Sequence, residues 1–232
     1  MLRTEFVDVE RWASRAADVF ATSITNAVAA RGHAVVALSG SVTPLPVLAE
    51  LATRQLPWIN IVFTQVDERI APLGSPERNL TAQRELLGSQ RCSWLPLPVD
   101  KADEAGIVGQ LALDEFEVEL KAQLGDGQFD IVHLGLGSDG HTASLVPGDP
   151  LLGQAGGLVG QSIEYNGARR LTLTSAAINN SRRIVWLIRG EAKTEVLGRL
   201  LAHDATIPAA LISQDRAIVI ADETANPSLR RV

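Results

Sequence analysis

The chain has 232 residues, of which 46% are hydrophobic and 21% charged, a balance that is ordinary for a globular protein. Lys and Arg number 21 and Asp and Glu 27, so the formal net charge is −6, which argues against nucleic acid or an anionic membrane as a partner. The single cysteine, Cys92, excludes an internal disulfide framework and a multi-cysteine zinc site.

No apolar run approaches the roughly 18–20 residues that a membrane helix needs. The first residues carry acids where a signal peptide has an apolar stretch. We therefore expect a cytoplasmic protein with no membrane partner.

The predicted elements alternate between helices and short buried strands. An amphipathic pattern predicts a helix over residues 9–31, and an apolar run predicts a strand over 33–38. A helix is expected to begin at Pro44, with Thr43 as its cap. The same reasoning predicts further strands at 59–63, 129–134, 170–174, 184–188 and 217–222, helices at 75–87, 101–124 and 190–202, and a loop at 151–160.

Strands separated by helices favour parallel pairing and an α/β, doubly wound sheet with helices on both faces. We interpret residues 1–232 as a single α/β domain, with at most a small appended subregion. Because loops at the carboxyl ends of parallel strands meet at one edge of the sheet, the loops after Leu38, Phe63 and Leu134 are the expected place for a site.

The first candidate site is the loop Ser39-Gly-Ser-Val-Thr-Pro44. Gly40 allows close approach of the backbone to a ligand, Ser41 and Thr43 add hydroxyl groups, and a helix N-terminus that follows favours an anion. A tight turn with no ligand would explain the same residues.

The second candidate is Asp67-Glu68-Arg69, with Arg78 and Asn79 further along. An arginine at a strand end can hold a phosphate or carboxylate through two parallel hydrogen bonds, and the acids can orient it or act as a base. The alternative is a solvated, self-paired charge cluster.

The third candidate, Gly135-Leu-Gly-Ser-Asp-Gly-His-Thr-Ala-Ser144, is the most specific. Its glycines, Gly137 among them, match a dinucleotide-binding pattern. However, the motif lies in the middle of the chain, and Pro147 and Pro150 leave little room for the long helix that carries a pyrophosphate. We therefore expect no nicotinamide or flavin cofactor.

His141 in this motif is better interpreted as a reagent, because an imidazole can take a proton from water and return it near neutral pH. Asp139 is close enough in sequence to influence it. The alternative is that His141 only caps the following turn. By contrast, His33 and His133 lie inside apolar runs and are expected to be satisfied histidines of the core or its edge.

The fourth candidate is a pair of cations around a predicted strand. Arg182 precedes the strand and Lys193 opens the helix after it, so each could add positive charge near an anionic ligand. Arg183 and Arg189 are expected to be surface bases.

Together, these motifs and their order resemble the 6-phosphogluconolactonase family over nearly the whole chain. The resemblance implies a modified Rossmann-like fold and hydrolysis of 6-phospho-D-glucono-1,5-lactone to 6-phospho-D-gluconate, the second step of the oxidative pentose phosphate pathway. It implies no metal and no cofactor, and a small-molecule substrate as the partner. The oligomeric state is left open as a monomer or a small homo-oligomer.

The resemblance also implies roles. His141 would activate water, with Asp139 and Arg69 in the catalytic group. The sugar phosphate would be bound by a wider set: Gly40, Ser41, Thr43, Asp67, Arg69, Asn79, Gly137, Arg182 and Lys193. Two positions depart from the family pattern, which usually has glycine at Ser41 and often serine at Arg78.

Two alternatives remain at this point. Glucosamine-6-phosphate deaminases resemble the chain in the same motifs, but they carry a glutamate where this chain has Val146, and that glutamate supports their catalytic histidine. Non-catalytic sugar-phosphate-binding regulators use related sheets, usually with a DNA-binding segment for which this acidic chain has no evident counterpart.

Overall fold

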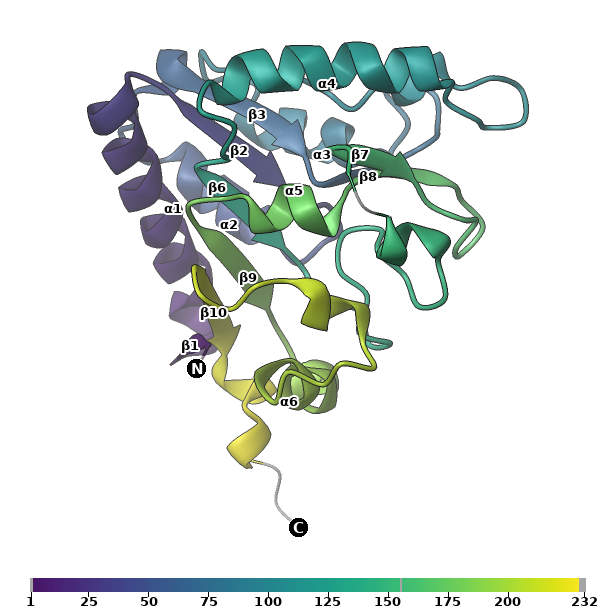
Figure 1. Ribbon diagram of the computed structural model, residues 1–232. Coiled ribbons are helices and arrows are strands. Elements are labelled where there is room, and N and C mark those ends of the chain that lie inside the picture. The colour runs from purple at the N-terminus through teal and green to yellow at the C-terminus, as the bar shows by residue number, and fades with distance from the viewer. Residues whose placement is uncertain (1, 155, 230–232) are drawn as a thin grey trace.

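A seven-stranded parallel sheet forms the centre of the computed structural model, which describes residues 2–154 and 156–229 (Figure 1). The strand order is β1-β10-β9-β6-β2-β3-β5, and every pairing in it is parallel. The strands are β1 (Arg3–Val7), β2 (Ala34–Leu38), β3 (Ile61–Gln65), β5 (Ser93–Trp94), β6 (Ile131–Leu134), β9 (Ile184–Ile188) and β10 (Ala217–Asp222).

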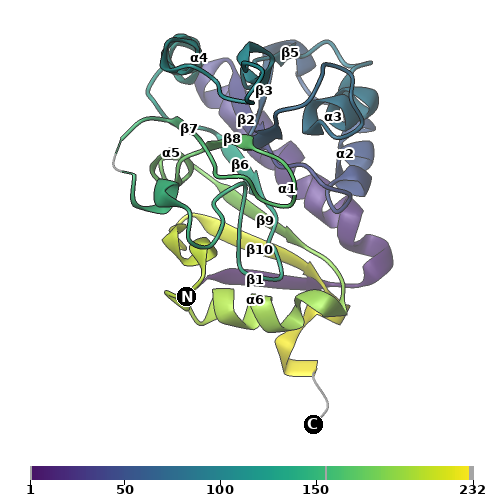
Figure 2. The same cartoon turned by 90° about the vertical axis from the view of Figure 1, so that its right-hand side faces the viewer.

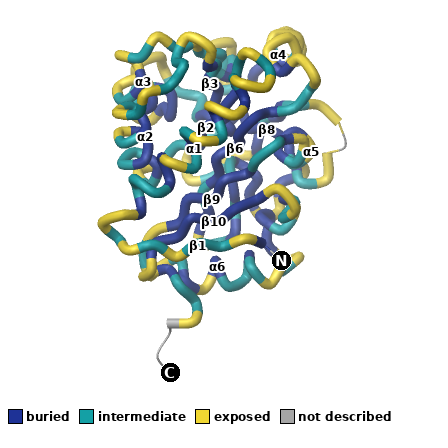
Figure 3. The backbone as a smooth tube through the Cα atoms, turned by 90° about the vertical axis from the view of Figure 1, so that its left-hand side faces the viewer, coloured by how far each residue is buried: buried dark blue, intermediate teal, exposed yellow. Residues whose placement is uncertain are grey.

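Helices cover both faces of this sheet because its strands are apolar on both sides. On β2, Val36 packs into one core with Trp12 and Phe20 of a helix, while Val35 packs into a second core on the other face. Figure 3 shows these strands as the buried centre of the molecule. The first face carries α1 (Val9–Arg31), α2 (Leu45–Ala52) and α3 (Asn79–Leu87); the second carries α4 (Gln110–Leu124), α5 (Ser175–Asn179) and α6 (Thr194–Leu201).

A small antiparallel sheet lies beside the large one (Figure 2). It consists of β4 (Asp67–Arg69), β8 (Arg170–Leu173) and β7 (Val159–Gln161), in the order β4-β8-β7. Val66 joins the two sheets: its N–H donates to the Leu38 carbonyl at 2.9 Å, and its own carbonyl accepts from the Leu173 N–H at 2.7 Å. The end of β3 therefore runs directly into the small sheet.

The order of the large sheet reverses between β2 and β6. From β2 the chain adds β3 and β5 on one side, and from β6 it adds β9 and β10 on the other. In open α/β sheets such a reversal leaves a crevice outside the carboxyl ends of the two strands, where ligands bind. The loops after Leu38 and Leu134 meet there, as the sequence predicts.

The predicted fold class is confirmed, with the helix over 9–31 and the strands at 184–188 and 217–222 found as expected. Several boundaries are wrong. The strand predicted at 59–63 begins at Ile61, after a 3-10 turn, and the helices predicted at 75–87 and 101–124 begin at Asn79 and Gln110. The loop predicted at 151–160 contains a 3-10 turn and enters β7; its residue 155 lies outside the described residues.

The expected cap of α2 is also wrong. The Thr43 side chain makes no capping hydrogen bond, and Pro44 occupies the cap position. Within residues 2–154 and 156–229, no helix is both long and apolar enough to cross a membrane.

Candidate active site

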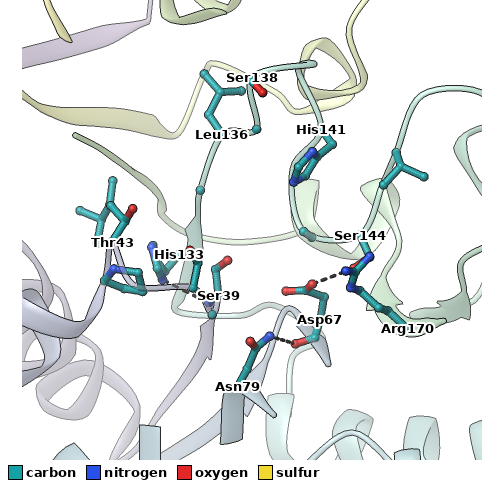
Figure 4. Close-up of a pocket in the computed structure, with 18 of the residues that line it drawn as sticks. Ser39, Thr43, Asp67, Asn79, His133, Leu136, Ser138, His141, Ser144 and Arg170 are labelled. Carbon is teal, nitrogen blue, oxygen red and sulfur yellow. Dashed lines mark hydrogen bonds between the residues drawn. The ribbon is translucent and has the colours of Figure 1, made fainter. Parts of the chain in front are cut away.

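A cavity of about 370 Å³ lies at the carboxyl ends of β2, β6 and β9 (Figure 4). The loops after these strands form one side, and β4, β8 and the β7–β8 loop of the small sheet form the other. Eight of the predicted residues line it: Gly40, Ser41, Thr43, Asp67, Arg69, Asn79, Gly137 and Lys193; His141 is a ninth.

The loop after β6 is folded tightly around Gly137. The Gly137 N–H donates to the His141 carbonyl at 2.8 Å, and the Gly140 N–H donates to the Gly137 carbonyl at 3.0 Å. A Cβ on Gly137 would overlap the His141 ring and approach Asp139 Oδ1 to 2.7 Å. Glycine is therefore required here so that the two side chains can meet.

His141 and Asp139 form the expected pair. Nδ1 of His141 lies 2.6 Å from Oδ1 of Asp139, and the imidazole is turned toward the cavity (Figure 4). Partial burial acts to raise the pKa of Asp139, but hydrogen bonds from Tyr165 and His141 outweigh it, so that pKa is lowered. Because an ionised carboxylate only accepts hydrogen bonds, Nδ1 carries the proton and Nε2 is the basic nitrogen.

The loop after β2 is held against β6 by His133. Nδ1 of this buried histidine accepts a hydrogen bond from the Ser39 N–H at 3.1 Å, across the reversal point of the sheet. Burial lowers the pKa of His133 to about 3, so the ring is neutral. The prediction of a core histidine is right about burial, but His133 also lines the cavity.

Asp67 and Asn79 form the floor beneath His141. Asp67 Oδ2 accepts a hydrogen bond from the Ser144 hydroxyl at 2.7 Å. The backbone carbonyl of Asp67 accepts one from the side-chain amide of Asn79 at 2.8 Å. Burial raises the pKa of Asp67, against the lowering effects of Ser144 and nearby arginines. A Cβ on Gly40 would overlap the Asn79 side chain. Glycine at this position therefore lets the loop after β2 approach the floor of the cavity.

Four cationic side chains line this cavity: Arg69, Arg170 and Lys193, with Arg189 at the rim. Arg69 and Arg170 are register partners on β4 and β8, and Lys193 lies just before α6. Arg69 donates to the Glu77 carbonyl at 2.6 Å. Burial lowers the pKa of Arg170 and of Lys193, which shows that both charges are partly withdrawn from water. Such a cluster suits an anionic ligand.

Arg182 does not belong to this group, and its predicted place in the anion site is wrong. It precedes β9, so it lies at the amino ends of the parallel strands, the edge opposite the cavity. There it pairs with Asp126, and its Nε lies 3.4 Å from Asp130. A residue before a parallel strand cannot reach residues that follow the neighbouring strands.

Three members of the site were not predicted from the sequence: Arg170, Ser144 and Tyr165. Arg170 and Tyr165 belong to the small sheet and its loop, whose position depends on tertiary contacts. Only Ser144 carried a signal, because it closes the motif that contains His141. Arg189, expected on the surface, is exposed but also lines the rim of the cavity.

Comparison with known proteins decides the family. The family model described as glucosamine-6-phosphate isomerases/6-phosphogluconolactonase matches residues 7–220. The chain belongs to this family. It is 35% identical over 225 residues to the 6-phosphogluconolactonase of Synechocystis sp., covering 90% of both chains, and 35% identical over 216 residues to that of Caulobacter vibrioides, covering 88% of this chain and 89% of the relative.

Solved structures agree with membership of the glucosamine-6-phosphate isomerase/6-phosphogluconolactonase family. The crystal structure of 6-phosphogluconolactonase from Thermotoga maritima is 27% identical, with a TM-score of 0.81 over 95% of this chain and 98% of that chain. A 6-phosphogluconolactonase from Shewanella baltica is 26% identical, with a TM-score of 0.81 over 96% and 98%. The resemblance identified from the motifs is therefore confirmed, together with the Rossmann-like fold.

Proposed function

We propose that this protein hydrolyses 6-phospho-D-glucono-1,5-lactone to 6-phospho-D-gluconate, as a cytoplasmic enzyme of the oxidative pentose phosphate pathway. The observation that carries the proposal is His141, which pairs with Asp139 and lines a cavity together with the cationic Arg69, Arg170 and Lys193. The names of the relatives support the substrate, since they are 6-phosphogluconolactonases at 35% identity over almost the whole chain.

His141 acts as a general base. With Nδ1 held by Asp139, Nε2 takes a proton from water while the water oxygen attacks the lactone carbonyl carbon. The carbon–oxygen bond of the ring then breaks, and the ring oxygen leaves with the proton from His141. The product acid loses its proton to solvent, and His141 returns to its starting state without forming a covalent bond to the substrate.

The cationic side chains bind the phosphate and stabilise the negative charge that develops during the reaction. Arg69 and Lys193 bind the phosphate or stabilise the negative charge that develops on the carbonyl oxygen, and the partly buried Arg170 adds to this field. The sugar phosphate is further bound along the walls and the floor of the cavity, by Gly40, Ser41, Thr43, Asp67, Asn79 and Gly137.

Deamination of glucosamine 6-phosphate is the less favoured activity. Val146, at the place of the supporting glutamate of that family, is buried and lines the cavity. The carboxylate that accepts from His141 is Asp139 instead. The acid–base partner needed at that place for ring opening is thus replaced by an apolar side chain.

The test is hydrolysis of 6-phosphoglucono-δ-lactone generated in situ, with the spontaneous rate subtracted and with EDTA present. Acceleration that survives EDTA and is lost in His141→Ala supports the proposal. A rate equal to the background contradicts it, and deamination of glucosamine 6-phosphate would then be measured on the same preparation.

A further inference from the structure

The loop between β7 and β8 contains a tight hairpin turn that presents the only tyrosine of the chain. Tyr165 and Ala168 exchange backbone hydrogen bonds, with N···O distances of 3.0 and 3.3 Å. Between them, Asn166 and Gly167 have φ values of 51° and 74°. Asn-Gly is the pair that most readily adopts two successive positive φ angles in a two-residue hairpin. The turn therefore sets the backbone direction at Tyr165.

The Tyr165 side chain reaches the catalytic pair directly. Its hydroxyl donates to Oδ2 of Asp139 at 2.7 Å, while Oδ1 of the same carboxylate faces Nδ1 of His141. The two rings meet edge to face, with 5.5 Å between centroids and 67° between planes. Tyr165 thus contacts both members of the pair from the side of the small sheet.

Arg170 contacts both the backbone and the ring of Tyr165. Its NH1 donates to the Tyr165 carbonyl at 2.9 Å, and its guanidinium carbon lies 5.7 Å from the centre of the phenol ring. The guanidinium also faces Asp67 and Arg69, and Lys193 acts on Asp139 across the cavity. The charged and titratable groups around the phenol are therefore Asp139, His141, Arg170 and, through Asp139, Lys193.

We propose that Tyr165 is a positioning residue that holds Asp139 in the orientation in which it fixes the His141 tautomer. This inference rests on the proposed lactone hydrolysis. A carboxylate with one partner can rotate about its Cβ–Cγ bond, whereas separate partners on its two oxygens define the plane of the group.

A spectroscopic experiment tests the contact without reference to activity. Because Tyr165 is the only tyrosine, the phenolate absorbance of the folded protein reports this residue alone. The hydrogen bond to Asp139, then burial, raises the pKa of Tyr165 above its ordinary value of 10.0. We expect the titration midpoint to lie above that value and to fall in Asp139→Asn, and to stay in place in Asp215→Asn, which changes an exposed carboxylate. A midpoint that is the same in all three proteins would overturn the proposal.

Kinetics test the consequence. Tyr165→Phe keeps the ring and removes one hydrogen bond, so we expect kcat to fall roughly 3- to 10-fold with KM little changed. The pH profile of kcat/KM should change, because the carboxylate that fixes the His141 tautomer is no longer held in place. A folded variant with unchanged kcat and an unchanged profile would overturn the positioning role.

The two readouts separate this inference from the proposed function. If the wild-type protein lacks lactonase activity but Asp139→Asn lowers the tyrosine midpoint, the hydrogen-bonded network is supported and only the proposed function fails. If the protein is active but neither variant changes its readout, the positioning role of Tyr165 is overturned and the proposed function stands.

Discussion

Nδ1 of His141 lies 2.6 Å from Oδ1 of Asp139, a residue only two positions earlier in the chain. The backbone can bring these side chains together because the loop doubles back on Gly137, whose N–H bonds to the His141 carbonyl. The proposed catalytic pair is thereby built within five residues, on a loop anchored to a buried strand.

Asp139→Asn tests the pair itself. An amide can donate to Nδ1 as well as accept from it, so the tautomer with a basic Nε2 is no longer enforced. We expect kcat to fall roughly 10- to 100-fold, with the thermal unfolding midpoint nearly unchanged, since Asp139 is partly exposed. Asp215→Asn is the control and should keep wild-type kinetics; an equally small effect of both substitutions would contradict the role of Asp139.

Gly137→Ala tests the space that the pair requires. The added Cβ would overlap the His141 ring and push it from its position. A displacement on the order of 1 Å at a catalytic group costs about 100-fold in rate, so a loss of that size is expected in kcat. Gly153→Ala is the matched control, because nothing lies within 4 Å of the Cβ it would add. Steady-state kinetics of both variants decide the matter, and equal activity would argue against the close packing at Gly137.

Arg69→Ala and Arg182→Ala test whether the phosphate binds in the cavity or at the opposite edge of the sheet. Loss of a charge-assisted contact with the phosphate should raise KM roughly 10- to 100-fold in Arg69→Ala. KM should be unchanged in Arg182→Ala, since Arg182 bonds to Asp126 on the far edge. A rise in KM in Arg182→Ala alone would contradict the placement of the anion site.

His133 gives the stability a pH dependence that can be measured. Its pKa is about 3 in the folded protein and near 6.5 when exposed, so the unfolded chain binds the extra proton between these values. The contribution of His133 to stability is therefore complete above about pH 6.5 and is lost as the pH falls toward 3.

His133→Asn keeps an acceptor near the Ser39 N–H but cannot bind this proton. Between pH 7 and pH 4.5, we expect the wild type to lose about 2–3 kcal/mol more free energy of unfolding than the variant, measured by urea titration. Buried Asp67 and Glu68, whose pKa values are raised by burial, act in the opposite direction in both proteins and cancel in the comparison. His203→Asn, at an exposed histidine, should follow the wild type. Parallel curves for the wild type and His133→Asn would contradict a neutral buried ring.

The backbone conformation at Ser41 explains why the family usually has glycine at this position. Its φ is 75°, in the left-handed region where glycine carries no steric cost. Ser41→Gly should therefore unfold at an equal or slightly higher denaturant midpoint, with a gain of up to about 1 kcal/mol, while Ser41→Val should be destabilised. A loss of stability on introducing glycine would contradict the strained loop.

The second departure, Arg78, is buried beside Glu68 and bonds to Asp100 at 2.6 Å. Glu68 in turn accepts the N–H groups of Arg69, Asn79 and Leu80. A serine at this position would leave the buried carboxylate without its cation. Arg78 thus stabilises Glu68 beneath the floor of the cavity and does not line the cavity itself.

The five inner strands of the large sheet were predictable from the sequence because they are apolar runs, such as Ile184–Ile188, that are buried on both faces. The edge strands β1 and β5, which are short or partly exposed, were not predicted. Of the small sheet, only β8 was predicted, as the strand at 170–174. β4 is the charged tripeptide Asp67–Arg69, and it becomes a strand only because β8 lies beside it. The Asn166-Gly167 turn did carry a sequence signal, yet its contact with Asp139 joins residues 26 positions apart.

The candidate site was predicted best where it is local in sequence. The His141 motif specifies its own geometry through glycines, and Lys193 follows β9, which places it at the carboxyl edge of the large sheet. The prediction for Arg182 was wrong because it rested on the charge of the side chain and did not use the direction of the strand that follows it. In a parallel sheet that direction alone decides which edge a side chain occupies.

The central claim is that Nε2 of His141 activates water in a cavity whose binding groups are independent of it. The most direct measurement compares kcat for lactone hydrolysis with calorimetric binding of 6-phosphogluconate in the wild type and in His141→Asn. We predict that kcat falls at least about 100-fold while product affinity stays within about 3-fold. Turnover near the wild-type rate in a folded His141→Asn protein would contradict the account.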